Sequence, residues 1–190
     1  MKIAYCVKST PAPHLNHPDV PLFMLGVHLA GYDYLLPEIR FKRNAYGVDT
    51  WFDGSLGVFN LRSSRDPNIV ETLDVFDGLR NYVASQHWSQ IDIDRVIIGS
   101  TKDVEAPIRP SDATGTALKR HIRGTSDEMR EMQYAATLEA TPESVKETML
   151  RVLDANEPRS SICVVSSREK INEANERLGN KRLTVSEILP

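Results

Sequence analysis

Five histidines are the residues of this 190-residue chain best suited to bind a catalytic metal ion: His14, His17, His28, His87 and His121. None belongs to an H-E-x-x-H or inverted H-x-x-E-H pattern, which places two histidines and a glutamate on one helix at a zinc ion. His14 and His17 are close in sequence, but they lie in a proline-rich segment without a third ligand nearby. A catalytic zinc ion needs about three protein ligands, so the sequence predicts no metal site and no cofactor in this chain.

Nucleophilic chemistry finds equally little support. The sequence has no G-x-S-x-G elbow and no glycine-rich phosphate loop after a strand. Its two cysteines, Cys6 and Cys163, lie in separate apolar runs, too few for a disulfide framework or a cysteine metal site. We expect both to be buried thiols in a reducing, soluble compartment, either cytoplasm or an organelle matrix.

The segment E-I-R-F-K-R-N-A-Y-G, residues 38–47, offers a different kind of chemistry. A predicted helix ends there, the chain turns, and a strand begins at Tyr46. A phenol hydroxyl such as that of Tyr46 can stabilise a developing oxyanion, and a guanidinium such as that of Arg40 can grip carbonyl oxygens while staying charged. An arginine near a helix end and a tyrosine opening an inward-facing strand are, however, more often helix-capping and packing residues. The residues alone leave both interpretations open.

The elements that would position this segment follow from periodicity and turn signals. Helices are predicted over residues 20–30, 33–42 and 169–178, with others starting at 66 and near 89, 111, 125 and 141. Strands are predicted over residues 2–8, 45–52, 57–63, 161–165 and 182–185. This order predicts an α+β fold in which helices pack on an antiparallel or mixed sheet.

Several helix ends carry recognisable signals. Gly31 is expected to close the first helix in a left-handed conformation. Asp66 followed by Pro67 is expected to act as an N-cap before a proline at the first helical position. Thr125 and Glu128 have the spacing of a capping box.

Composition limits the class of protein. An apolar content of 41% and a charged content of 26% are ordinary for a globular protein, and the length suits a single domain over residues 1–190. The formal net charge is −3, and no basic block occurs, so we expect no nucleic-acid partner. No apolar run approaches the roughly 20 residues that cross a bilayer, so we expect no membrane partner.

Five motifs occur in an order that resembles a known family. They are I-R-x-x-x-x-A-Y-G from Ile39, R-D-P-N from Arg65, E-T-L-D-V-F-D-G from Glu71, E-A-P from Glu105 and G-T-S-D-E from Gly124. Together they are similar to the final domain of presequence proteases, the peptidasome branch of the pitrilysin, or insulinase-like, zinc metallopeptidases. The resemblance covers most of the chain, from about Leu22 to the end.

The resemblance implies a fold and a site. Its members are clamshells of four homologous α+β domains, of the type seen in LuxS/MPP-like metallohydrolases. The first domain carries the inverted zinc motif, and the last contributes an arginine and a tyrosine to the substrate. By position these match Arg40 and Tyr46 here, with Asn44, Ala45 and Gly47 as neighbouring substrate-binding residues. The cofactor would then be a zinc ion in the amino-terminal domain of the parent enzyme.

The leading hypothesis is therefore a carboxy-terminal, zinc-free domain of a clamshell metallopeptidase that degrades unfolded peptides. Its partners would be the zinc-bearing amino-terminal half, on the same or a separate chain, and peptide substrates. We expect the isolated chain to be inactive and to self-associate through the surface that its neighbour would cover. The alternative is a non-catalytic, core-like scaffold or interaction domain. It is favoured by Arg43 and Asn44, which replace the two glycines of the family pattern.

Overall fold

The computed structural model describes residues 3–187, apart from the side chains of residues 103–105 and 181. Its centre is a four-stranded sheet with the order β2-β3-β1-β4, in which every neighbouring pair is antiparallel. The strands are β1 (Ala4–Pro11), β2 (Gly47–Asp53), β3 (Val58–Asp66) and β4 (Ser161–Val165). The predicted α+β fold, with helices on an antiparallel sheet, is confirmed.

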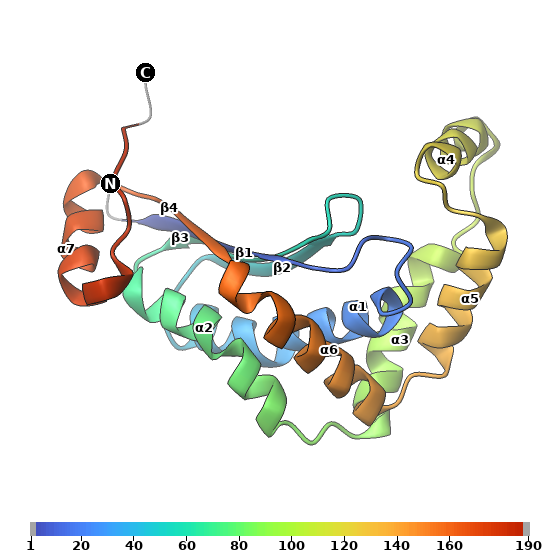
Figure 1. The fold of residues 1–190 in the computed structure, drawn as a ribbon, viewed down its shortest axis with the longest axis horizontal. Helices are drawn as coiled ribbons and strands as arrows, with labels where there is room; N and C mark the ends of the chain where they lie inside the picture. The colour runs from blue at the N-terminus through green and yellow to red at the C-terminus, as the bar shows by residue number, and fades with distance from the viewer. Residues whose placement is uncertain (1–2, 188–190) are drawn as a thin grey trace.

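One face of this sheet is covered by helices (Figure 1). The covering layer consists of α1 (Val20–Leu29), the π-helix η1 (Ala30–Phe41), α2 (Val70–Ser85) and α6 (Pro142–Asn156). Helices α3 (Gln90–Glu105) and α5 (Asp127–Leu138) pack beside α1. Helix α4 (Pro110–Ile122) projects beyond these two, and α7 (Arg168–Leu178) lies at the opposite end of the sheet (Figure 1). Two short 3-10 turns, η2 (Glu157–Arg159) and η3 (Gly179–Lys181), complete the described elements.

The core lies between the sheet and the covering helices. Successive side chains of a strand point to opposite faces, and alternate β1 residues from Ala4 to Thr10 are buried on the helix side. Phe23 of α1 packs edge-to-face on Phe52 of β2 and Phe59 of β3, with ring centroids 5.6 and 5.5 Å apart. These aromatic contacts fix α1 against the hairpin that contains β2.

A buried cation also joins the sheet to its helices. Lys8 is only 5% exposed, and its Nζ donates to Asp77 of α2 at 2.8 Å and to Glu157 of η2 at 3.0 Å. A buried charge is tolerated only when it is paired, so this lysine holds both elements at one place on β1.

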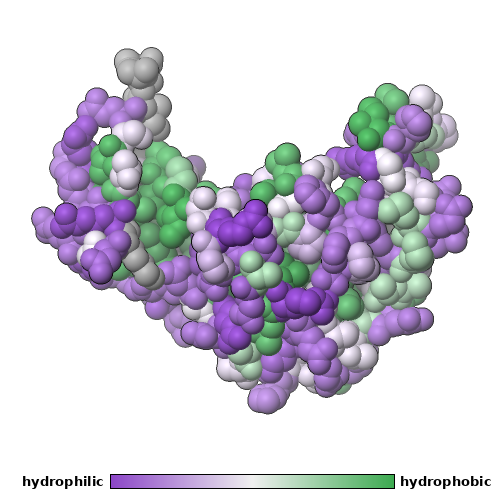
Figure 2. Space-filling model, viewed as in Figure 1, coloured by the Kyte–Doolittle hydropathy of each residue, from purple (hydrophilic) through white to green (hydrophobic). Residues whose placement is uncertain are grey.

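The opposite face of the sheet is uncovered by the described helices. Tyr5, Trp51 and Val165 are 40%, 47% and 40% exposed there, and the Asp49 carboxylate accepts a hydrogen bond from Arg62 Nε at 2.7 Å. This face forms the floor of a hollow between α4 and the end of the molecule that carries α7 (Figures 1 and 2). Apolar surface gathers beside the carboxy-terminal segment at that end (Figure 2).

The predicted end of the first helix is wrong. Gly31 has no left-handed conformation, and the helix continues without a break from α1 into η1 as far as Phe41. A Cβ atom at Gly31 would come within 2.9 Å of Thr50 Oγ1. The glycine is therefore explained by close approach of the helix to β2, which local sequence does not show.

Two further helix signals were misassigned. Asp66 is the last residue of β3, and α2 begins only at Val70. The Asp66 side chain accepts a hydrogen bond from the Asn68 amide in the turn between the two elements, so it does not cap the helix. The N-cap of α5 is Ser126 instead of Thr125, whose hydroxyl contacts Asn16.

The carboxy-terminal region also departs from prediction. β4 forms over residues 161–165, but it is an edge strand, and Cys163 pairs with Val7 on the uncovered face of the sheet, so it is exposed rather than buried. The expected strand at 182–185 is absent from the described chain, where Leu183 instead exchanges two hydrogen bonds with the Asn175 side chain. No helix between residues 3 and 187 combines the length and apolar character needed to cross a membrane.

The two cysteines should react at very different rates. Burial, the largest cause, raises the pKa of the Cys6 thiol to about 12, so very little of it is thiolate at neutral pH. We expect an aromatic disulfide reagent at pH 8 to label one thiol of the native chain quickly and the second only on unfolding. Cys163→Ser should remove the fast phase, whereas Cys6→Ala should keep it. A fast phase that survives Cys163→Ser would contradict the burial of Cys6.

Candidate functional site

Tyr46 lies on the surface between η1 and β2. Its side chain is 65% exposed, and the guanidinium of Arg65 sits over its ring, 4.8 Å from the ring centroid. A cation over an aromatic face is attracted by the ring's electron density, so this contact restrains the ring and leaves it accessible. Tyr46 is thus outside the hydrophobic core.

Arg40 occupies the last turn of η1, at the other end of the same connection. Its side chain is exposed and has no hydrogen-bond or ion-pair partner among residues 3–187. The structure places Arg65, and not Arg40, over the Tyr46 ring. Arg40 therefore keeps all of its guanidinium donors available for a ligand.

The turn between these residues is closed by backbone bonds. Asn44 has a φ of 62°, a left-handed conformation that asparagine tolerates better than most residues. Its amide donates to the Arg40 carbonyl at 3.0 Å, and the amide of Ala45 donates to the Ile39 carbonyl at 3.2 Å. These bonds satisfy carbonyls at the end of the helix and set the direction in which the chain enters β2.

The three neighbouring candidates differ in accessibility. Asn44 is exposed, whereas Ala45 is 3% exposed and belongs to the core, so Ala45 could meet a peptide only through its backbone. Gly47 faces Ser64 of β3, and a Cβ atom there would lie 2.6 Å from Ser64 Oγ. Close packing against β3 accounts for this glycine.

Arg43, which replaces a family glycine, turns away from Tyr46. Its Nη1 donates to the Glu38 carbonyl at 2.6 Å and to Glu38 Oε2 at 2.8 Å, one turn back along η1. Glu38 also accepts from Lys42, and the hydrogen bonds from Lys42 and Arg43 lower the pKa of its carboxyl group. The bulk of Arg43 is therefore directed along the helix, and the Tyr46 ring stays open.

The R-D-P-N run, residues 65–68, holds the turn between η1 and β2 through hydrogen bonds from the end of β3. The sequence indicated only a helix-capping role for this run. Asp66 is fully buried and accepts hydrogen bonds from the Asn68 amide at 2.8 Å and the Thr72 hydroxyl at 2.7 Å. The Asn68 side chain then donates to the Arg43 carbonyl at 2.8 Å. Arg65 itself has a φ of 47°, a strained conformation for a side-chain-bearing residue, and it is the residue that lies over Tyr46.

The histidines do not assemble a metal site in the part of the chain that the structure describes. No three His, Cys, Asp or Glu side chains gather there. His17 Nδ1 accepts a hydrogen bond from the Asp19 amide at 3.1 Å, and burial lowers the pKa of His28. The candidate site is thus an exposed tyrosine and an exposed arginine on a turn closed by backbone hydrogen bonds, and both side chains can donate hydrogen bonds.

Comparison with known proteins gives this geometry a context. Residues 20–168 match the family model described as the PreP C-terminal domain. Presequence protease 1, chloroplastic/mitochondrial, of Arabidopsis thaliana is 28% identical over 162 residues, which are 85% of this chain but 15% of that protein.

Two solved structures show the same fold. A putative zinc protease from Bordetella pertussis Tohama I superposes with a TM-score of 0.73 at 14% identity, over 86% of this chain and 94% of that one. A peptidase M16 inactive domain from Pseudomonas fluorescens has a TM-score of 0.69 at 20% identity, over 86% and 40% of the two chains. The family match includes both ends of the turn that carries Arg40 and Tyr46, and the chain belongs to the family of PreP C-terminal domains.

Proposed function

We propose that this chain is the carboxy-terminal, zinc-free domain of a clamshell metallopeptidase that degrades unfolded peptides, and that Arg40 and Tyr46 act on the substrate. The observation that carries this proposal is the state of Tyr46, which is 65% exposed yet restrained by Arg65. A tyrosine of the hydrophobic core would be buried, whereas Tyr46 is not. An exposed ring whose orientation is restrained is suited to a ligand that arrives from outside.

Tyr46 would act through its hydroxyl. A phenol that donates to a peptide carbonyl oxygen stabilises that oxygen more strongly as negative charge develops on it. In this proposal the zinc ion, which would supply the nucleophile when bound, is held by the amino-terminal half, as the family resemblance implies. Among the described residues, no three His, Cys, Asp or Glu side chains are grouped so that they could hold a metal ion.

Arg40 would act on the peptide before and during the reaction. Its guanidinium presents several donors in a planar fork, and none is engaged within residues 3–187. A carbonyl of the bound peptide is already present in the ground state, so this contact contributes to binding as well as to turnover.

The scaffold alternative rests on Arg43 and Asn44, which stand where the family pattern has glycines. Asn44 adopts the left-handed conformation that a glycine would supply, and Arg43 is held by Glu38. Both observations support retention of the turn, and we therefore favour the catalytic role. The tyrosine substitution below separates the two functions.

The proposed partner is the zinc-bearing remainder of the longer protein. The chain spans 15% of the length of the Arabidopsis relative, so most of such a protein lies outside it. We propose that the uncovered sheet face, with Tyr5, Cys163 and Val165, packs against that remainder, because contiguous exposed apolar surface commonly marks an interface. That relative is named chloroplastic/mitochondrial, and for this chain we propose a reducing, soluble compartment such as an organelle matrix.

Replacing Tyr46 with phenylalanine should impair catalysis after the zinc-bearing half has been restored, by fusion or mixing. The change removes one hydroxyl and keeps the ring under Arg65. We expect kcat to fall roughly 10²–10³-fold, the usual cost of one lost oxyanion donor, with little change in KM. Unchanged turnover with correct folding would favour the scaffold alternative. Because the side chain is largely exposed, Tm should shift by no more than about two degrees.

Replacing Arg40 with lysine should produce a different kinetic pattern. Lysine keeps the charge but loses the planar fork of donors. We expect both a raised KM and a lowered kcat, because the peptide carbonyl is present before the reaction as well as during it. Arg43→Lys is the matched control, since Arg43 binds Glu38 and should tolerate the change with little effect on either constant. Equal effects of the two substitutions would contradict a direct role for Arg40.

Docking of the zinc-bearing half on the open sheet face should shield Cys163. In the isolated chain this thiol is exposed, and we expect its labelling by a maleimide to slow at least tenfold when the other half is added at saturation. A cysteine placed on α4 as Leu118→Cys, at a position 57% exposed, is the control away from that face. Unchanged labelling of Cys163 in the assembled protein would rule out this interface.

A further inference from the structure

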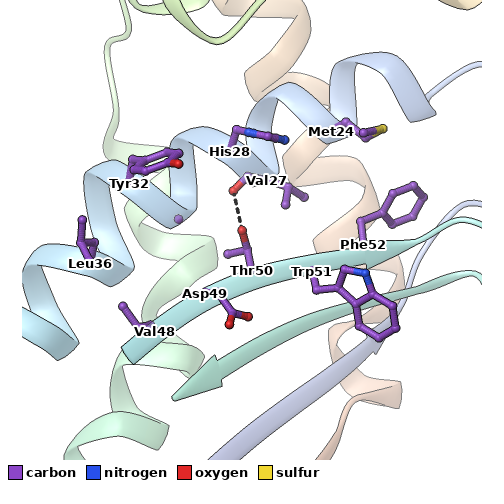
Figure 3. Close-up of a pocket in the computed structure, with 11 residues that line it drawn as sticks. Met24, Val27, His28, Tyr32, Leu36, Val48, Asp49, Thr50, Trp51 and Phe52 are labelled. Atoms are coloured by element: carbon purple, nitrogen blue, oxygen red, sulfur yellow. Dashed lines mark hydrogen bonds between the residues drawn. The ribbon is translucent and has the colours of Figure 1, made fainter. Parts of the chain in front are cut away.

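The outer edge of β2 borders a groove that the catalytic proposal does not use. β2 is a terminal strand of the sheet, so one row of its backbone amides and carbonyls has no strand partner in the described chain. Helices α1 and η1 run beside it and leave a groove of about 370 Å³ (Figure 3). Its helix side is formed by Met24, His28, Tyr32 and Leu36, which recur every four residues on one helical stripe.

The groove is held open by a fixed contact. The Thr50 hydroxyl donates to the Val27 carbonyl at 3.3 Å, and Gly31 allows the helix to approach Thr50 closely (Figure 3). The helix is therefore pinned to the middle of β2, while the exposed ends of Met24 and Tyr32, 37% and 68% exposed, remain at the rim. A site of this kind is preformed, because both walls are regular elements bonded to each other.

The edge of β2 lacks several of the features that normally block strand addition. Proteins protect edges with charged side chains, especially lysine, and with proline, bulges or very short strands. β2 has neither lysine nor proline, and its pairing with β3 runs from Gly47 to Asp53 without a bulge. Its two carboxylates are already engaged, Asp49 by Arg62 and Asp53 by backbone amides of the hairpin turn. Seven residues span roughly 23 Å at about 3.3 Å each, enough for a peptide of similar length.

The charges around the groove are already satisfied. Asp49 pairs with Arg62 at 2.7 Å, and Asp33 pairs with Arg95 at 3.3 Å. His28 is half-buried, and burial lowers its pKa, so it is neutral at pH 7. The walls therefore match uncharged side chains, and a strongly charged ligand would find no free counter-charge among them.

We propose that the groove binds an extended, uncharged stretch of peptide as an additional strand on the edge of β2, with alternate aliphatic side chains packed on the helix stripe formed by Met24, His28, Tyr32 and Leu36. The choice of a peptide rests on the proposed function. Backbone hydrogen bonds to the edge supply affinity, and the apolar stripe selects every second side chain. Since β2 begins directly after Tyr46, a peptide bound here would end beside the proposed catalytic turn.

The test uses this chain alone, without the zinc-bearing half, so its outcome is independent of turnover. The probe is a capped, fluorescein-labelled heptapeptide with threonine and valine in alternation, followed by fluorescence anisotropy and by backbone amide NMR shifts. We expect saturable binding, with the largest amide shifts in Val48–Phe52 of β2 and in the helix residues that line the groove. Tyr32→Glu and Met24→Glu should each weaken binding at least tenfold. Ile122→Glu on α4, at a position 73% exposed, should leave it unchanged.

Two N-methylated peptides provide a second, independent readout. Only every second amide of an added strand faces the edge, and the alternating side chains fix the register. N-methylation of one alternate set should abolish binding, while N-methylation of the other set should preserve it. Equal binding of both peptides, or shifts confined to the open sheet face, would overturn the proposal. If the amide shifts of β2 change with protein concentration when no peptide is present, the edge pairs with a second copy of the chain instead. If the peptide no longer binds once the zinc-bearing half is restored, the edge is covered by that half instead.

Discussion

The buried carboxyl group of Asp66 is the interaction on which the candidate site depends. It closes the end of β3 by accepting hydrogen bonds from the Asn68 amide and the Thr72 hydroxyl, which lies in the first turn of α2. Asn68, placed in this way, holds the Arg43 carbonyl. Loss of the carboxyl group would leave the buried Thr72 hydroxyl unpaired, at a cost of about 1–3 kcal/mol, and would release the half-buried Asn68 and with it the turn that presents Tyr46. One acidic side chain thus links strand, helix and site.

The second constraint is the one-sided sheet. The described helices cover one face, where Lys8 and the Phe23 cluster fix them, and the other face and the β2 edge remain available within the described chain. A face and an edge of a sheet recognise different things, because the face offers side chains and the edge offers backbone groups. The proposed interface with a neighbouring half and the proposed peptide groove therefore occupy separate surfaces of one scaffold.

The turn from Arg43 to Ala45 shows how a departure from a family pattern can be absorbed. Asparagine replaces a glycine at a left-handed position, where its cost is smaller than that of most residues. The arginine beside it is drawn back onto η1 by Glu38, so its charge is neutralised away from the Tyr46 ring. The backbone bonds to Ile39 and Arg40 then complete the turn without glycine.

Local sequence determined the fold class, most helices and strands, and the position of the turn that carries Arg40 and Tyr46, because periodicity and motif order are properties of short segments. Tertiary structure alone decided the rest. Gly31 marks a close approach to Thr50 instead of a helix end, and Cys163 is exposed because it lies on the uncovered face of an edge strand. Arg65 reaches Tyr46, and Asn68 reaches Arg43, only because β3 pairs with β2 and ends beside the turn. Such contacts join residues distant in sequence, and no local pattern encodes which side chains the sheet brings together.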